Sequence, residues 1–199
     1  MTRRKRWEAE WRTQVGTFRV YEPTAREVAE IASRLAAYYT EPHNRAMMAH
    51  EADLTPEDVV EHFQRVNTDG RGLLLELDGR LMGDADLRHV AGTEGETAIM
   101  IGDRSTQGKG LGTRFGLMIH AIAFQAVGLE RVYVSIIPAN RASQRLFEKL
   151  GYVRDNGPKA RGYADEDDDV TMSVTRAMVV QKHGEALSEI EVRERPAPN

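Results

Sequence analysis

The stretch from residue 97 to residue 128 constrains the fold of this chain more than any other. It starts with an apolar, partly β-branched run, passes through a turn that holds Gly108, Gly110 and Gly112, and enters an apolar helix directly. Gly128 follows the helix as its C-terminal stop. A strand that turns over glycines into a helix belongs to a domain of mixed α and β structure.

Other stretches show the period or the residue types of strands and helices. Strands are predicted at residues 15–21, 72–77, 80–87, 97–101, 131–137 and 170–174, and a further strand begins at Tyr152. Helices are predicted at residues 24–35, 55–68, 110–127 and 141–150. Thr24 and Thr55 are the expected N-caps of the first two helices, and Asp78-Gly79 predicts a tight type I′ turn. The order predicts an α+β fold with a mixed sheet of six to seven strands flanked by about four helices.

The composition places one globular domain between two charged ends. A chain of 199 residues, 41% hydrophobic and 29% charged, fits a single domain. Residues 1–14 include four consecutive basic residues, Arg3 to Arg6, and predict a flexible basic arm. Residues 15–180 hold the predicted elements, and residues 181–199 predict a tail that is disordered or docked on a partner. The net charge of −4 argues against general nucleic-acid binding, although the arm leaves that as a minor alternative.

Several function classes are excluded or disfavoured by what the chain lacks. Without cysteine it has no disulfide, no thiolate metal site and no cysteine nucleophile. His43, His50 and His62 show no metal-ligand spacing, so no metal site is predicted. No apolar run approaches the roughly 20 residues that span a bilayer, and no apolar stretch follows the basic N-terminus as in a signal peptide. These features favour a cytoplasmic protein without a membrane partner.

The glycine-rich turn is suited to binding a phosphate. Glycine lets the backbone approach a ligand closely, and the free N–H groups and dipole of the following helix favour negative charge. The candidate binding residues are Gln107, Gly108, Lys109, Gly110, Leu111, Gly112 and Thr113. The spacing matches neither the dinucleotide G-x-G-x-x-G nor the nucleoside-triphosphate G-x-x-x-x-G-K-[ST] pattern. A tight strand-to-helix turn with no ligand is the alternative interpretation.

Two motifs resemble the GCN5-related N-acetyltransferases (GNAT). Gln107-x-x-Gly110-x-Gly112 resembles that family's acetyl-CoA pyrophosphate loop, and residues 140–152 resemble its later N-x-x-[AS]-x-x-x-[YF]-x-x-x-G-[FY] block. The Asn-x-x-Ser pattern is similar to the ribosomal-protein N-terminal acetyltransferase branch. The resemblance implies a sheet that splays at the cofactor cleft, formed within residues 15–180, and acetyl-CoA as cosubstrate.

The resemblance also implies where the cofactor and the catalytic groups lie. The backbone of residues 107–112 would hold the pyrophosphate, and Ile99, Met100 and Ile101 would lie along the pantetheine arm. Further contacts to the cofactor would come from Asn140, Ser143 and Phe147. A neutral amine would attack the thioester directly, with help from a base, oxyanion donors and an acid for the thiolate.

The catalytic side chains are harder to assign. Phe147 stands where many relatives have a tyrosine acid, so Ser143 is the candidate to approach the CoA sulfur, beside Asn140. Glu96 lies close to the usual position of an acidic base. Asp84 and Asp86 share one face of a strand by period two, and one of them could serve as the base instead of Glu96. The other interpretation is that both simply lie on an exposed face of the strand.

Two other polar or aromatic side chains near the motifs are expected to be structural. His120 lies on the apolar stripe of the predicted helix, and Tyr152 is the aromatic residue of a strand.

The acceptor is left open by the sequence. The acidic run at residues 165–169 would attract a cationic amine or merely form a solvated loop. The region at residues 38–54 is expected to form the other wall of the acceptor site. A small-molecule or peptide amine is predicted as substrate, and a homodimer is a further expectation. The alternative function is a non-catalytic CoA-binding sensor or interaction module of the same fold.

Overall fold

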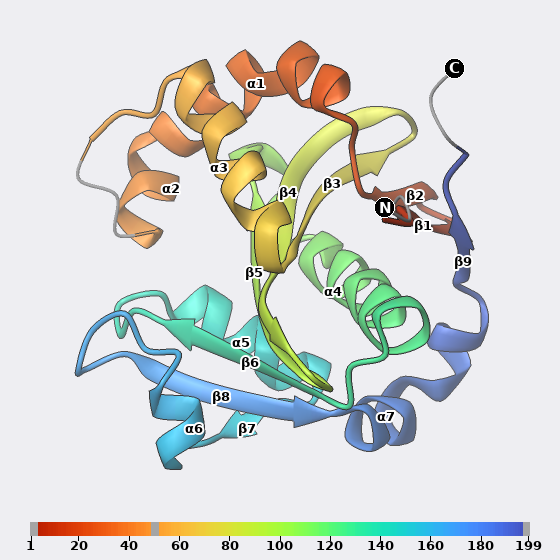
Figure 1. The fold of residues 1–199 in the computed structure, drawn as a ribbon, viewed down its shortest axis with the longest axis vertical. Helices are drawn as coiled ribbons and strands as arrows, with labels where there is room; N and C mark the ends of the chain where they lie inside the picture. The colour runs from red at the N-terminus through yellow and green to blue at the C-terminus, as the bar shows by residue number, and fades with distance from the viewer. Residues whose placement is uncertain (1–3, 49–51, 197–199) are drawn as a thin grey trace.

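A computed structural model describes residues 4–48 and 52–196, and in them one nine-stranded sheet organises the chain (Figure 1). The strands are β1 (Trp7–Thr13), β2 (Gly16–Tyr21), β3 (Arg71–Leu77), β4 (Arg80–Ala91), β5 (Glu94–Ile101), β6 (Arg131–Ile136), β7 (Val153–Arg154), β8 (Val170–Thr175) and β9 (Glu191–Glu194). The helices are α1 (Ala25–Thr40), α2 (Pro42–Met47), α3 (Pro56–Asp69), α4 (Leu111–Ala121), α5 (Arg141–Leu150), α6 (Pro158–Arg161) and α7 (Arg176–Ser188). A 3₁₀ turn (Arg104–Thr106) precedes α4, and a π-helical segment (Ile122–Val127) continues it.

The strand order is β7-β8-β6-β5-β4-β3-β2-β1-β9. Neighbouring strands are antiparallel except β5 and β6, which are parallel because α4 connects them as a crossover. The hairpin between β3 and β4 turns at Asp78 and Gly79, with φ of 50° and 74°. Positive φ at both positions is the type I′ geometry that was predicted for this pair.

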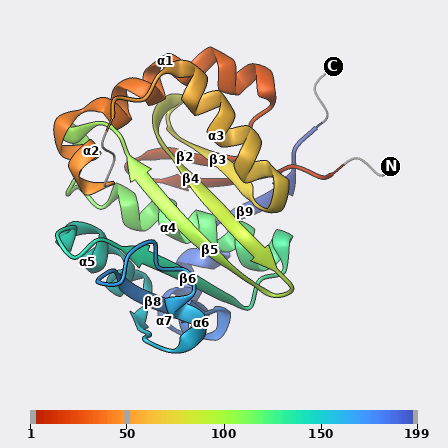
Figure 2. The same cartoon turned by 60° about the vertical axis from the view of Figure 1, so that its left-hand side comes forward.

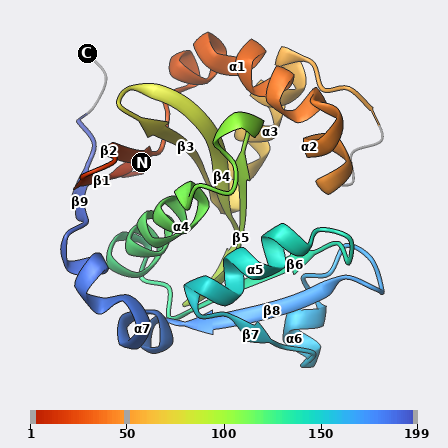
Figure 3. The same cartoon turned by 180° about the vertical axis from the view of Figure 1, so that it is seen from behind.

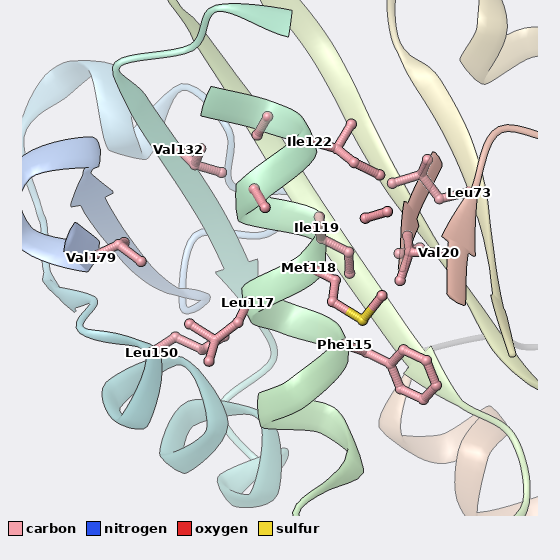
Figure 4. Close-up of a cluster of buried hydrophobic side chains, with 14 of the residues drawn as sticks. Val20, Leu73, Phe115, Leu117, Met118, Ile119, Ile122, Val132, Leu150 and Val179 are labelled. Atoms are coloured by element: carbon pink, nitrogen blue, oxygen red, sulfur yellow. The ribbon is translucent and has the colours of Figure 1, made fainter. Parts of the chain in front are cut away.

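The larger core lies on the α4 face of the sheet (Figures 3 and 4). Phe115, Met118 and Ile119 of α4 pack against inward side chains of β2 and β3, such as Val20 and Leu73. All five are at most 2% exposed. Complete burial of such side chains stabilises the fold by roughly 1.5–3 kcal/mol each, so α4 is anchored across the centre of the sheet.

The opposite face is covered by α1 and α3, which lie over β3, β4 and β5 (Figures 1 and 2). Thr24 and Thr55 are the N-caps, as predicted, and each forms a capping box, Thr24 with Glu27 and Thr55 with Asp58. Their apolar stripes pack on alternate residues of the strands, including Leu74. This face also receives polar side chains of β4 and β5, and these form the site described below.

The predicted number of elements was too low. The sheet has nine strands and not six to seven, and seven α-helices occur in residues 4–48 and 52–196 where about four were expected. The additional strands are β1 and β9, and the additional helices are α2, α6 and α7. Two of these helices, α2 and α6, are only six and four residues long, too short to show a helical period.

The two ends of the chain differ from the predicted flexible arm and disordered or partner-docked tail. Residues 7–13 form β1, which pairs with β2 on one side and with β9 on the other. Lys5 forms an ion pair with Glu194 at 2.8 Å, and Arg4 donates to the carbonyls of Asn67 and Gly70. Basic residues 4 and 5 are thus engaged within the fold, while Arg3 lies outside the described residues.

Charged side chains hold β9 against β1. Glu8, 5% exposed, accepts hydrogen bonds from Arg19 at 2.8 Å and from Arg193 at 2.7 Å. Arg195 reaches past β1 to Glu27 at 2.8 Å and lies over the ring of Tyr21, 4.6 Å from its centroid. The C-terminal segment is therefore an integral edge of the sheet.

Candidate active site

The sheet opens between its two parallel strands. β5 pairs with β6 only at Glu94↔Arg131, Gly95↔Val132 and Glu96↔Tyr133, whereas β6 pairs with β8 along its whole length. Beyond Glu96 the two strands diverge, so the edges of residues 97–101 and 134–136 are not paired with each other. Such an opening accepts an extended ligand that adds as a strand between the two edges.

Only part of the predicted pantetheine-binding strand faces the larger core. Ile99 and Ile101 are half-buried and pack toward the α4 cluster, while Met100 is buried among side chains of α1 and α3. On the other side the same residues pair with β4, at Ala85, Gly83 and Asp84. Their β4 edge is occupied, so the opposite edge is the one available to a ligand.

The glycine-rich loop forms the N-terminus of α4 with its backbone free. Gly108 and Gly110 have φ of 76° and 79°, in the left-handed region that favours glycine. Gly110 is the N-cap of α4 and supplies no side-chain cap. Within the described residues no acceptor is present for the N–H groups of residues 108–113, and a Cβ at Gly108 would meet nothing within 4 Å. Free donors, an open approach and the helix dipole fit a pyrophosphate.

The remaining residues of the loop divide between packing and charge. Leu111 is buried, and a Cβ on Gly112 would lie 3.2 Å from Leu146, so Gly112 also lets α5 approach α4. Thr113 lies in the first turn of α4. Lys109 is exposed, and Arg104 and Arg114 add two further positive charges beside the loop. Sequence reasoning named only the lysine, because the arginines lie outside the motif.

Gln107 has a structural role that its motif position did not reveal. Its Nε2 donates to the carbonyl of Ile101 at 2.7 Å and to Oδ1 of Asn44 at 3.0 Å. Asn44, 4% exposed on α2, in turn donates to the carbonyls of Tyr38 and Gly102, both at 2.9 Å. These bonds fix the loop to the end of β5 and to α2. Asn44 was expected only as part of the wall of the acceptor site. Its buried amide donates and accepts hydrogen bonds at both ends, so its role is to connect α2 with the loop.

Asn140, Ser143 and Phe147 lie on α5, on the β6 side of the opening. Asn140 is the N-cap, since its Oδ1 accepts from the backbone N–H of Ser143 at 3.0 Å. Its Nδ2 donates to the carbonyl of Met47 at 3.0 Å and so ties α5 to α2. The Ser143 hydroxyl is half-buried and has no hydrogen-bond partner in the described part of the chain. Phe147 is 3% exposed and packs edge-on to Tyr152, which makes it a core residue.

Glu96 lies where the pairing of β5 with β6 ends. It is 2% exposed, and its two oxygens accept from Nε and Nη2 of Arg88 at 2.8 and 2.9 Å. The pKa of Arg88 is raised, although burial alone would lower it, because Glu96 bonds to it. His89 lies 3.8 Å from the same carboxylate. Each carboxylate oxygen of Glu96 is thus engaged by Arg88 in a bidentate ion pair.

Asp84 and Asp86 lie on the same face as Glu96 and are buried, not exposed. Oδ2 of Asp84 accepts from the hydroxyl of Tyr39 at 2.9 Å, and Oδ2 of Asp86 lies 3.0 Å from Nε2 of His62. Burial, reinforced by the charge of Asp86, raises the pKa of Asp84 to about 7. The hydrogen bond to Asp86 raises the pKa of His62. Their burial follows from the position of α1 and α3, which no local pattern reveals.

The acidic run at residues 165–169 is exposed except for its last residue. Residues 165–168 are exposed, whereas Asp169 is buried and shapes the loop by accepting a hydrogen bond from Ser135 at 2.8 Å.

His120 is buried, lies 2.6 Å from the carbonyl of Gly116 and accepts from the Tyr152 hydroxyl at 2.7 Å. Burial lowers the pKa of His120 to about 4, so it is neutral. His120 and Tyr152 are therefore packed structural residues, as predicted.

A comparison with protein families decides the identity of this arrangement. A model of the acetyltransferase (GNAT) domain matches residues 18–153, which include both motifs and the opening between β5 and β6. The chain belongs to the GNAT acetyltransferase family. The family prediction is confirmed, and with it the enzyme class, an N-acetyltransferase with acetyl-CoA as cosubstrate. No curated protein matches the chain in sequence.

Solved structures of similar fold include several acetyltransferases. RimJ from Mycobacterium smegmatis, solved with CoA-disulfide, is 16% identical with a TM-score of 0.69, covering 93% of this chain and 96% of its own. The aminoglycoside acetyltransferase AAC(6')-Ib, solved with ribostamycin and coenzyme A, is 19% identical with a TM-score of 0.66, covering 80% and 93%. Spermidine N-acetyltransferase from Vibrio cholerae, solved with CoA and spermine, is 15% identical with a TM-score of 0.64, covering 82% and 98%. At these identities the likeness establishes the GNAT fold.

The residues of this GNAT domain fit acetyl-CoA. The free N–H groups of residues 108–113 suit its phosphates, and the unpaired edge of β5 suits its amide-containing arm. β5, the loop and α5 border one opening, although Met100 and Phe147 are buried away from it. Hydrogen bonds join α2 to Gly102 directly after β5, to Gln107 of the loop and to Asn140 at the start of α5. Among the helices of the described residues, none is both long and apolar enough to cross a membrane.

Proposed function

We propose that the enzyme transfers an acetyl group from acetyl-CoA to a primary amine of a small molecule or peptide. The observation that carries the proposal is the opening between β5 and β6, with the free N-terminus of α4 at its end. A thioester laid in that opening lies at the level where pairing stops, beside Glu96. The amine then reaches it from the face that α1 and α3 cover.

The side chains have separate roles in this reaction. The loop at residues 107–113 holds the pyrophosphate through its backbone, with positive charge nearby from Lys109, Arg104 and Arg114. The free hydroxyl of Ser143 donates to the CoA sulfur as the thiolate leaves, which Phe147 cannot do. Asn140 keeps Ser143 in place by capping α5. Glu96 is committed to Arg88, so we assign it to holding the site in shape.

The acceptor is inferred to be a cationic amine. The polar face beside the opening carries the carboxyl groups of Asp84 and Asp86, and the exposed acids at residues 165–168 lie in the loop that leads into β8. A field of this sign concentrates ammonium groups. Neighbouring structures hold spermine or the aminoglycoside ribostamycin, and one is a ribosomal-protein-S5-alanine acetyltransferase. Cytoplasmic location and a homodimer stay predictions.

Thiol release tests the proposal directly. The enzyme is incubated with acetyl-CoA and, separately, spermine, ribostamycin and a peptide with an N-terminal alanine, and free CoA is measured with a thiol reagent. Acetylation of at least one amine, verified by a mass increase of one acetyl group, is expected. Binding of acetyl-CoA with no acetylation of any amine would instead favour the non-catalytic module.

A further inference from the structure

Two buried carboxylates on β4 each have one oxygen without a partner. Asp84 is 2% exposed and Asp86 is 5% exposed. Across residues 4–48 and 52–196, neither Oδ1 atom has a hydrogen-bond donor. Buried polar atoms are nearly always paired, and an unpaired buried carboxylate oxygen is costly. Two such atoms on one face of a strand indicate a ligand that donates hydrogen bonds to both.

The other oxygen of each carboxylate is fixed by a neighbouring helix. Tyr39 on α1 donates to Oδ2 of Asp84 at 2.9 Å, and His62 on α3 lies 3.0 Å from Oδ2 of Asp86. Arg65 lies 3.3 Å from Nδ1 of His62, which makes that nitrogen the acceptor and places the proton on Nε2, toward Asp86. Each carboxylate is thereby oriented with one oxygen held and the other left over.

The pair lies next to the opening that receives the thioester. Asp84 is the cross-strand partner of Met100, and Asp86 is that of Ala98, on the part of β5 whose other edge is unpaired. Adjacent strands are about 4.8 Å apart. An amine bound to the two free oxygens is therefore separated from the opening by the width of one strand.

We propose that Asp84 and Asp86 bind the acceptor as its ammonium ion, and that Asp84 takes the proton that makes the amine nucleophilic. This inference rests on the proposed acetyl transfer. An N–H bond of the ammonium breaks and an O–H bond forms on Asp84. The neutral nitrogen then attacks the thioester carbon, the C–S bond breaks, and the nitrogen loses a second proton as the thiolate gains one. One proton is released overall.

His62 holds Asp86 in its orientation from the surface of α3. Its side chain is 27% exposed, whereas the Asp86 side chain that it contacts is 7% exposed. Its Nε2–H donates to Oδ2 of Asp86 and leaves Oδ1 of that carboxylate free for the ammonium. His62 is a positioning residue here, because it does not contact the substrate.

The charges around the pair suit proton transfer near neutral pH. Burial and the charge of Asp86 raise the pKa of Asp84 to about 7, while the Tyr39 hydrogen bond and His62 oppose the rise. Arg88 and Glu96, on the same face, neutralise one another. A base with a pKa close to the working pH combines a high fraction of the basic form with useful basicity.

The test compares Asp84→Asn, Asp86→Asn and His62→Ala with the natural enzyme, using spermine, ribostamycin and the alanyl peptide as acceptors. Asparagine retains an acceptor for Tyr39 or His62, so the fold is expected to survive. For Asp84→Asn we expect kcat/KM for the amine to fall by about 100-fold or more, with loss of the rising limb near pH 7. His62→Ala should raise KM for the amine by roughly tenfold and change kcat less, because Asp86 loses the hydrogen bond that orients it.

Controls separate this inference from the proposed function. Glu57→Gln and Glu61→Gln on α3 alter exposed acids and should leave the rates unchanged. Acetyl-CoA affinity should change less than about twofold in all variants, since the pair lies off the loop. If Asp84→Asn and Asp86→Asn retain the kcat/KM and pH profile of an active enzyme, the inference is wrong and the acetyl transfer stands. If the natural enzyme acetylates none of the three amines, both are wrong.

Discussion

At the scale of the residue, burial of the Asp84 carboxyl group lowers the stability of the folded protein at neutral pH. Its pKa is about 7 in the folded chain against 3.8 for an ordinary aspartate. Because the folded state holds this proton more tightly than the unfolded state, stability falls as the pH rises from about 4 to about 7. Above pH 7 the full penalty remains, up to about 4 kcal/mol for a shift of three units.

Asp84→Asn is therefore expected to stabilise the protein at pH 8 while it removes activity. The free energy of unfolding in urea should rise by about 1–4 kcal/mol at pH 8, and the gain should vanish below about pH 3, where the aspartate is protonated in both states. Asp168→Asn, at an exposed position, serves as the control without effect. A variant that is less stable than the natural protein at pH 8 would contradict the burial argument.

The sequence predicted the role of a residue well where that role depends on neighbours close in the chain. The Thr24 and Thr55 caps, the Asp78-Gly79 turn and the structural role of His120 follow from short-range patterns and were confirmed. The burial of Asp84 was not predictable, because it depends on α1, whose Tyr39 comes 45 residues earlier in the chain.

At the scale of the element, α4 and α5 approach closely through glycine. A Cβ on Gly116 would lie 2.6 Å from Cδ1 of Leu150, a fully buried side chain. Gly116→Ala should therefore destabilise the protein by about 1–3 kcal/mol through overpacking, measured by urea unfolding.

Gly184→Ala on α7 is the matched control for this substitution. A Cβ at Gly184 would meet nothing within 4 Å, and alanine favours helix. The variant should leave stability unchanged or raise it slightly. Equal stability of the two variants would show that the contact between α4 and α5 tolerates a methyl group.

The edge strand β9 illustrates a second element-scale effect. Arg195 is 12% exposed in its side chain and bonds to Glu27 at 2.8 Å and to the carbonyl of Glu22 at 2.6 Å. Arg195→Ala should lower the free energy of unfolding by about 1–3 kcal/mol at pH 7. Because Arg195 helps to lower the pKa of Glu27 to about 2, the difference should shrink as the pH falls from 5 toward 2. Arg26→Ala, at an exposed ion pair, is the control, and a pH-independent difference would contradict this interpretation.

The strands β1 and β9, which pair the two ends of the chain with each other, were not predicted. The exposed face of β1 is charged, so residues 7–13 resembled a solvated arm, and β9 is four residues long with one intermediate and three exposed side chains. β1 becomes a strand because β2 and β9 pair with its two edges, and β9 becomes a strand because β1 pairs with it. Pairing between the two ends of a chain leaves no local signal.

At the scale of the whole molecule, the sheet serves to hold two strands apart. The α4 core fixes β5, while β6 is held by β8, so the strands diverge after Glu96 without either losing its outer partner. The motifs predicted the loop and the α5 cap that flank this opening, because both depend on residues close in sequence. The tie from α2 to both sides, through Asn44 and Asn140, emerged only in three dimensions.

Calorimetric titration with acetyl-CoA tests the central claim most directly, with ATP as a second ligand and Gly110→Val as the matched variant. Valine is β-branched and would have to adopt φ of 79° at the N-cap of α4, beside Arg114. We predict saturable binding of acetyl-CoA, no binding of ATP, and at least tenfold weaker acetyl-CoA binding by Gly110→Val, a loss of about 1.4 kcal/mol or more. Absence of acetyl-CoA binding at millimolar concentration, or equal affinity in Gly110→Val, would contradict the assignment of this loop to the cofactor.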